Sequence, residues 1–481
     1  MNDESTRGTP TTLGYRTVLS GLLMVELVSG LIQGIVPTMT PALGKQLGVS
    51  TAALNWISSI FLLSSVVWVP VLSKLGDQYG HRRLLRIAVA FLALGSVLVA
   101  VAPNFAVLLL GRAFQGALLA CLPLEMALVR DRLDPERARS AIAVLLGVLT
   151  AGFSLGYVLG GVLLEFPWSA QHALLIPAAA TVLVILAPMT MVPESSTTNR
   201  APAGMDWTGA CLLTVGLGAV MMSLAFGPKQ GWTSPLVVGL LIGGIAVLAV
   251  WLRIELGQRS PLVSVRELAR PNVLPLYLSA FLVGMVSFGP LTAFSTFAAT
   301  PRSTGYGLSL NGVLLGLFLT TLGAGVFLAS VIAPRAARRW PQHRVVMAGF
   351  VCGAIGFAVL PLAQAHWSTM AAAIVFVGLA EGLVVATLPV MILERLPADS
   401  AGISAGMYNV VRTLGGSVMG AIIAIVLAAH TPASGVVTSA GYITVWLVAA
   451  ALSTAGVVLV VATNRTASAT DSLQTINAVR N

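Results

Sequence analysis

Charged residues are scarce in this sequence: Asp, Glu, Lys and Arg make up 9% of its 481 residues, whereas hydrophobic residues make up 57%. Soluble domains carry roughly 25% charged residues, because their surfaces face water. So few charges cannot cover a hydrophobic core of this size with polar surface. The composition therefore excludes an ordinary soluble fold.

Cysteines and catalytic signatures are also sparse. The 3 cysteines, Cys121, Cys211 and Cys352, stand singly in apolar segments without metal-ligand spacing, so we assign them no role and expect no metal site. The sequence has no H-E-x-x-H motif, no G-x-x-x-x-G-K-S/T motif and no G-x-S-x-G motif in a suitable context. Hydrolysis and ATP-driven pumping by this chain are therefore disfavoured, and we expect no enzyme activity and no cofactor.

Long apolar runs dominate what is present. About 14 of them, between residues 17 and 463, are long enough to cross a bilayer, which predicts an all-α integral membrane protein. Basic residues gather in alternate loops, namely Lys74, Arg82, Arg83 and Arg86; Arg130, Arg132, Arg137 and Arg139; Arg253, Arg259, Arg266 and Arg270; and Arg335, Arg338, Arg339 and Arg344. The opposite side holds only Lys45, Lys229 and Arg302.

This charge asymmetry predicts the orientation. Because basic loops stay in the cytoplasm, we expect a multi-pass protein of the cell membrane with both termini cytoplasmic. The net charge of +10 follows from that topology, so the expected partner is the lipid bilayer and not nucleic acid.

Two polar segments divide the chain. Pro193–Asp206 and Gln258–Asn272 are rich in loop-forming residues and flank a pair of apolar spans. Removing that pair leaves six spans on each side, which favours a duplicated six-helix unit around a central site. The expected organisation is a tail at 1–16, an N-terminal six-helix bundle at 17–192, a linker with two extra transmembrane helices at 193–272, a C-terminal six-helix bundle at 273–463 and a tail at 464–481.

The loop after the second span carries the most informative motif, S-K-L-G-D-Q-Y-G-H-R-R-L-L at residues 73–85. Gly80 permits a tight turn, Asp77 offers a carboxylate to a helix N-terminus or an arginine, and Arg82 and Arg83 hold the loop in the cytoplasm. The string resembles the signature of the major facilitator superfamily at the same place between the second and third helices. The resemblance implies that fold and a cytoplasmic gate. Since a histidine replaces one arginine of the signature, we expect the charge relay of Asp77 to run through Arg82.

Other segments resemble the same superfamily, namely Asn55-Trp56 with Phe61 at the start of the second span and Gly111-Arg112-Ala-Phe-Gln115-Gly116 in the fourth. The segment 227–232 between the two extra spans and the segment 409–416 resemble its fourteen-helix drug:proton antiporter group. The resemblance implies a secondary transporter that exports hydrophobic or cationic small molecules, such as drugs and antibiotics, in exchange for protons. We expect it to act as a monomer.

The fifth span departs from the exporter pattern. It contains Gly152, Gly156, Gly160 and Gly161, but a tyrosine stands where exporters of the superfamily usually have a proline. Glycines four residues apart let two helix backbones approach closely, so a packing motif is predicted. The kink that proline would cause is not expected.

Five ionisable residues lie inside expected spans: Glu26, Arg112, Glu125, Glu381 and Arg412. Each costs roughly 2.5–3.5 kcal/mol near a helix centre, so such residues usually face a cavity or one another. Glu26 lies about 14 Å from the cytoplasmic end of the first span. A carboxyl in an apolar setting favours its protonated form, so Glu26 is predicted either to bind a proton or a cationic substrate, or to be a structural carboxyl.

The remaining four residues receive different expectations. The resemblance implies that Arg112 acts on a nearby carboxyl proton, with Glu26 as its first candidate partner. Glu381 is predicted as a second proton or cation site, or as a structural carboxyl. Arg412 is expected to brace its helix, and Glu125 to extend to the cytoplasmic boundary as a structural residue. Candidate residues of a polar cavity are Gln33, Asn55, Gln115, Asn409 and Arg412.

Two alternatives to drug export stay open. Proton-coupled uptake of a small metabolite is favoured by the missing proline of the fifth span. A non-transporting membrane sensor or partner protein is a second alternative, although such proteins commonly carry a sizeable soluble domain and the longest loop here has only about 20 residues.

Overall fold

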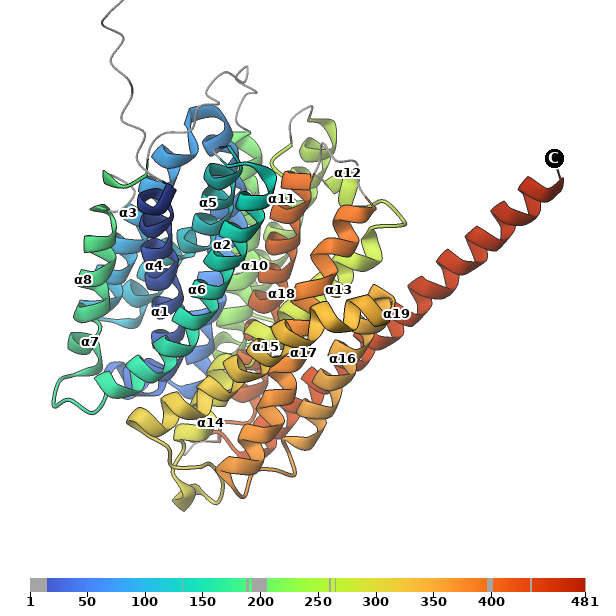
Figure 1. The fold of residues 1–481 in the computed structure, drawn as a ribbon. Coiled ribbons are helices and arrows are strands. Elements are labelled where there is room, and N and C mark those ends of the chain that lie inside the picture. Colours follow the sequence, from blue (N-terminus) through green and yellow to red (C-terminus); the bar gives the residue numbers. More distant parts are fainter. Residues whose placement is uncertain are drawn as a thin grey trace, which may run out of the picture.

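A computed structural model of the chain describes residues 15–480, apart from 132, 187–189, 193–205, 259–260, 264, 396–400 and 433–434. Within this range the chain folds into helices joined by turns, with no β-strand (Figure 1). The expected N-terminal tail and the polar segment Pro193–Asp206 lie almost entirely outside the described residues, and Arg132 and Arg259 also lie outside them.

Helices up to residue 184 form the part of the bundle that we call the N-half. Its helices are α1 (Tyr15–Leu47), α2 (Thr51–Tyr79), α3 (His81–Ala100), α4 (Phe105–Gln115), the 3₁₀ turn η1 (Gly116–Ala120), α5 (Cys121–Arg130), α6 (Pro135–Leu163), α7 (Ala170–Ala173) and α8 (Leu175–Val184). Because α4, η1 and α5 follow one another directly, they make up one membrane span with a change of helix type inside it.

The inserted pair and the second bundle follow. The inserted pair is α10 (Trp207–Gln230) and α11 (Pro235–Gly257). The second bundle, which we call the C-half, contains α12 (Val265–Leu268), α13 (Leu274–Phe288), α14 (Leu291–Ala299), η2 (Arg302–Thr304), α15 (Gly312–Arg339), α16 (Gln342–Val359), α17 (Trp367–Glu394), α18 (Ala401–Ala429) and α19 (Ser439–Arg480). In place of a separate tail at 464–481, α19 continues as a helix beyond the bundle (Figure 1).

The number of membrane spans agrees with the sequence analysis. Among the described residues, 13 helices are long and apolar enough to cross a membrane. The expected sixth span, 170–192, is represented by the shorter apolar stretch Ala170–Val184. The all-α membrane fold predicted from the sequence is therefore confirmed, with 13 long helices and this short one accounting for the expected spans.

Glycines bring α1 and α6 into direct backbone contact. A Cβ atom built on Gly34 would lie 2.1 Å from the carbonyl oxygen of Phe153, and one built on Gly156 would lie 2.4 Å from the carbonyl oxygen of Leu31. Only residues without a side chain allow this approach. The contact joins α1 and α6 into one rigid pair on the side of the N-half that faces the C-half.

The two halves meet along two pairs of helices, α2 with α18 and α6 with α15. Hydrogen bonds between the halves lie toward the helix ends opposite the basic loops: Ser295 Oγ donates to the carbonyl of Pro37 at 2.6 Å, and the hydroxyls of Ser58 and Thr292 are 3.0 Å apart. The carbonyl of Pro37 is free to accept because residue 41 is also proline and has no N–H to offer it.

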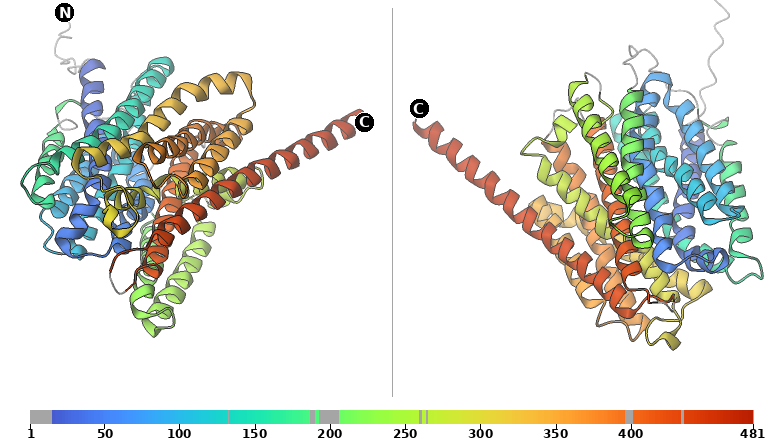
Figure 2. Two further views of the ribbon diagram at one scale, coloured as in Figure 1. Left: turned by 90° about the horizontal axis from the view of Figure 1, so that it is seen from below. Right: turned by 180° about the vertical axis from the view of Figure 1, so that it is seen from behind.

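The inserted pair lies outside the two halves. In Figure 2 the green helices α10 and α11 stand beside the junction of the halves and project away from it. They pack on each other, and α10 also contacts α2 and α18. The insertion therefore adds to the outside of the twelve-helix arrangement without separating the two halves.

Candidate functional site

Two acidic side chains meet in the core of the N-half. Glu26 of α1 is 1% exposed and Glu125 of α5 is 0% exposed, and their carboxyl groups lie within hydrogen-bonding reach of each other. No other group in the described part of the chain hydrogen-bonds to Oε1 of Glu26 or to either carboxyl oxygen of Glu125. The expectation that Glu125 extends to the cytoplasmic boundary is wrong, because its side chain is turned into the helix bundle toward Glu26.

Arg112 of α4 does not pair with Glu26. Its Nε donates to the carbonyl of Ile57 at 3.1 Å, its Nη1 donates to Oε1 of Gln115 at 2.6 Å, and its guanidinium lies 4.4 Å from the ring centroid of Phe61. The expected pairing with Glu26 is therefore wrong. The two residues lie at different depths in the membrane. Arg112 and Glu125 are about 20 Å apart along one span at 1.5 Å per residue, and Glu26 lies beside Glu125, nearer the basic loops.

An ion pair occupies the C-half. Arg412 Nη2 of α18 lies 3.0 Å from Oε1 of Glu381 on α17, and the two side chains are 14% and 15% exposed. The guanidinium also stacks 4.5 Å from the ring centroid of Phe288. Thus Arg412 does more than brace its own helix, since it neutralises Glu381.

Two buried tyrosines lie near this ion pair. Tyr408 stands one helical turn before Arg412, and its buried hydroxyl lies within reach of the Arg412 guanidinium. Tyr157, which takes the place of the missing proline in α6, has a buried hydroxyl without a partner and lies within electrostatic reach of Glu381. Because Tyr157 belongs to the N-half, the ion pair lies where the two halves face each other.

The other candidate polar residues are dispersed. Gln115 joins Arg112 to Ser96 through a 3.0 Å hydrogen bond, so it belongs to the Arg112 network. Asn55 bonds within its own helix and Gln33 does the same, by donating to the carbonyls of Ala52 and Ser29 respectively. Asn409 is half-buried on α18. Gln33, Asn55 and Gln115 therefore hydrogen-bond to separate groups in the described part of the chain.

The gate motif is organised around His81. Its Nε2 is 3.2 Å from Asp77 and its Nδ1 is 3.5 Å from Asp131, at the end of α5. Gly80 makes the turn between α2 and α3 with φ +98°, a conformation that side chains disfavour. Asp77 therefore pairs with His81, and the expected relay of Asp77 through Arg82 stays a prediction. Arg83 is exposed beside this turn.

The glycines of α6 serve two neighbours. Gly152, Gly156 and Gly160 face the backbone of α1, whereas a Cβ on Gly161 would lie 2.4 Å from the carbonyl oxygen of Gly312 on α15. The helix α6 runs without interruption from Pro135 to Leu163, as expected in the absence of the proline. The helix α6 thus packs closely against α1 within the N-half and against α15 of the C-half.

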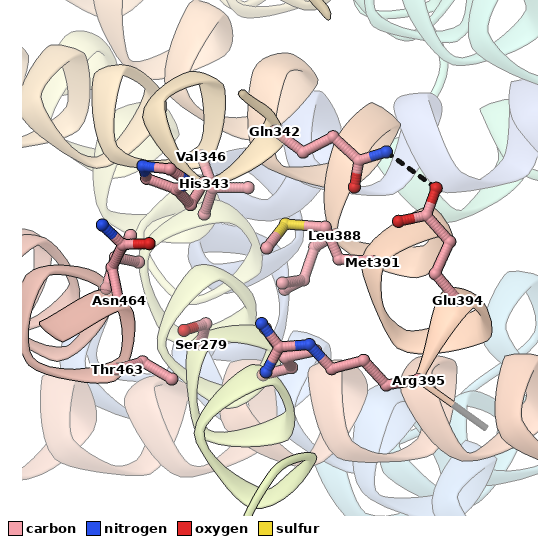
Figure 3. Close-up of a pocket in the computed structure, with 12 residues that line it drawn as sticks. Ser279, Gln342, His343, Val346, Leu388, Met391, Glu394, Arg395, Thr463 and Asn464 are labelled. Carbon is pink, nitrogen blue, oxygen red and sulfur yellow. Dashed lines mark hydrogen bonds between the residues drawn. The ribbon is translucent and has the colours of Figure 1, made fainter. Parts of the chain in front are cut away.

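A separate cavity of about 280 Å³ lies at the basic-loop ends of α13, α16, α17 and α19 (Figure 3). Leu388 and Met391 contribute apolar surface, and Gln342 donates a 2.9 Å hydrogen bond to Glu394 at its edge. It includes none of the buried ionisable residues of the two halves.

Two acidic contacts were missed from the sequence. The first is the Glu26–Glu125 pair, which a comparison of depth would have suggested, since both residues lie in the basic-loop half of their spans. The second joins Asp206 and Glu255, whose carboxyl groups meet where the inserted pair begins and ends. Lys74 of the gate loop lies within electrostatic reach of both.

Buried ionisable pairs inside a bundle of apolar helices, arranged as two halves that meet face to face, define a multi-pass membrane protein of the transporter class. The chain belongs to the Major Facilitator Superfamily, whose family model matches residues 22–420. The expected family is therefore confirmed, and its members are transporters and not enzymes.

Relatives and solved structures agree with this assignment. The chain is 24% identical over 438 residues to the uncharacterized MFS-type transporter EfpA of Mycobacterium tuberculosis, covering 89% of this chain and 81% of that protein. It is 27% identical to the tetracenomycin C resistance and export protein of Streptomyces glaucescens, covering 86% and 75%. The crystal structure of the nucleoside transporter NupG is similar in fold, with a TM-score of 0.64 at 14% identity, covering 93% of this chain and 98% of that one.

Proposed function

We propose that this transporter exports hydrophobic or cationic small molecules, such as drugs and antibiotics, from the cytoplasm in exchange for protons. The proposal places it in the cell membrane as a monomer with both termini cytoplasmic, as the alternate basic loops favour. The similarity to a resistance and export protein supports the direction of transport and the substrate class.

The observation that carries the proposal is the Glu381–Arg412 ion pair at the junction of the halves. A cationic substrate that reaches Glu381 would compete with Arg412 for its carboxylate, because both present positive charge to the same oxygen atoms. The ring of Phe288, which already stacks on a guanidinium at 4.5 Å, offers a face for an aromatic cation. The cationic substrate would thus replace the Arg412 guanidinium beside Glu381, and the net buried charge around this carboxylate would change little.

Protons supply the driving force in this proposal, and Glu26 carries them in the N-half. A carboxyl buried at membrane depth can bind a proton when open to one side and release it when open to the other. Arg112 has a positioning role, because its guanidinium is already engaged by the carbonyl of Ile57 and by Gln115.

Transport of ethidium, a fluorescent aromatic cation, tests the proposal. In proteoliposomes we expect an imposed pH gradient to drive ethidium toward the acidic compartment, and Glu381→Gln to abolish this movement. Gly147→Ala is the matched control, since a Cβ at Gly147 would meet nothing within 4 Å.

The alternative outcomes are distinct. Movement of ethidium away from the acidic compartment would make the protein a proton-coupled importer. No movement of ethidium or of any uncharged antibiotic under a pH gradient would remove the basis for the export assignment.

A further inference from the structure

We propose that Glu26 and Glu125 form one proton-binding site, which holds a single proton between the two carboxyl groups and releases it when α1 and α5 separate. The inference deepens the proposed function and rests on it, because it names Glu125 as a second residue of the coupling site.

Burial and proximity together require a shared proton. Both side chains are at most 1% exposed, so water stabilises negative charge on them far less than at the surface, and a second negative charge is the most unfavourable. Two carboxylates in contact repel each other strongly in a medium of low dielectric constant, which excludes two negative charges. One proton between the carboxyl groups replaces this repulsion with a hydrogen bond from a carboxyl to a carboxylate. Such a bond is stronger than one between two neutral groups, because its acceptor is ionised.

No cation neutralises the pair. Among the described residues, neither Glu26 nor Glu125 forms an ion pair, and the electrostatic influences on each come from the other. In the described part of the chain, the thiol of Cys121, one turn earlier on α5 and fully buried, is a further titratable group that senses both carboxyls. A structural carboxyl would ordinarily be satisfied by a basic residue or several N–H donors, and this pair has neither.

The span that carries Glu125 contains a change of helix type. The 3₁₀ turn Gly116–Ala120 separates α4 from α5, and mid-helix 3₁₀ turns often mark hinges. On one side of it Arg112 ties α4 to α2 through the carbonyl of Ile57. On the other side α5 has only 10 residues, so Glu125 can move relative to a fixed α4.

Each partner of the pair is connected to a different part of the molecule. Glu26 stands on α1, which the glycine contacts hold against α6. Glu125 stands on α5, whose end is linked to the gate motif through the 3.5 Å contact of Asp131 with His81. Opening or closing of the gate would therefore change the distance between the carboxyl groups, and with it the affinity of the pair for its proton.

Infrared difference spectroscopy of the purified protein tests for the shared proton without any transport. At neutral pH we expect the carbonyl band of a protonated carboxyl, which Glu26→Gln/Glu125→Gln removes. Glu381→Gln is the matched control and leaves the band unchanged, because a carboxylate paired with arginine is ionised. The proposal would be overturned if the native protein and the double variant had the same infrared spectrum in this region.

Transport in proteoliposomes separates a coupling role from a structural one. We expect Glu125→Gln to lose transport driven by a pH gradient and to keep exchange of ethidium down its own gradient, while Glu125→Asp restores part of the driven transport. Normal gradient-driven transport by Glu125→Gln would contradict the proposal. If the native protein moves no ethidium, the proposed function fails while the infrared measurement still decides whether the proton is shared.

Discussion

At the scale of single residues, the buried charges of this protein are satisfied in three different ways. Glu26 and Glu125 contact each other, Arg112 is surrounded by a carbonyl, an amide oxygen and an aromatic ring, and Glu381 pairs with Arg412. Removing one member of a buried ion pair leaves an uncompensated charge, whereas removing both does not. The three arrangements therefore differ in what a substitution does to stability.

The Glu381–Arg412 pair gives the clearest prediction of this kind. We expect Glu381→Gln and Arg412→Gln each to destabilise the protein by about 3 kcal/mol, and the double variant to be less destabilised than either single variant. Unfolding of the purified variants in detergent, followed by intrinsic fluorescence, measures the difference. Additive losses in the double variant would show that the 3.0 Å contact contributes nothing to stability.

At the scale of elements, the helix α6 connects packing to function. Its glycines contact α1 on one side and α15 on the other, and Tyr157 lies within electrostatic reach of Glu381 in the C-half. Without the proline, the helix stays continuous, so a displacement of its end near α15 would be transmitted along its whole length to α1.

Two glycines of α6 provide a matched test of this packing. A Cβ on Gly156 would lie 2.4 Å from the carbonyl oxygen of Leu31 and 2.9 Å from Cα of Gly34, whereas one on Gly147 would meet no atom within 4 Å. Overpacking costs roughly 1–3 kcal/mol, so we expect Gly156→Ala to destabilise the protein by about that amount. Gly147→Ala should leave stability unchanged or raise it slightly. Gel filtration and thermal unfolding in detergent compare the two, and equal behaviour would contradict the packing argument.

At the scale of the whole molecule, the sequence predicts the helical architecture better than it predicts which buried side chains contact each other. The membrane spans follow from the apolar runs in the sequence, because each span is a local property. The partner of Glu26 is not local. The sequence shows five ionisable residues in apolar runs, but only the relative depth and rotation of α1 and α5 decide that Glu26 meets Glu125.

The arrangement of the halves is also a property of the whole molecule. Hydrogen bonds between the halves, such as Ser295 with Pro37 and Ser417 with Ser59, join the helix portions remote from the basic loops. A transporter that alternates access has to separate these portions in the other part of its cycle. Contacts on this side should therefore break and re-form with every turnover.

A reversible cross-link across this junction tests that motion. The hydroxyls of Ser58 and Thr292 are 3.0 Å apart, which brings the positions close enough for a disulfide. In a background with Cys211 replaced by serine, we expect oxidised Ser58→Cys/Thr292→Cys to transport nothing, because α2 and α14 can no longer separate, and reduction to restore transport. Each single variant should be insensitive to the oxidant. Continued transport by the fully oxidised double variant would mean that these faces stay together throughout the cycle, and the separation of the halves would then have to occur elsewhere.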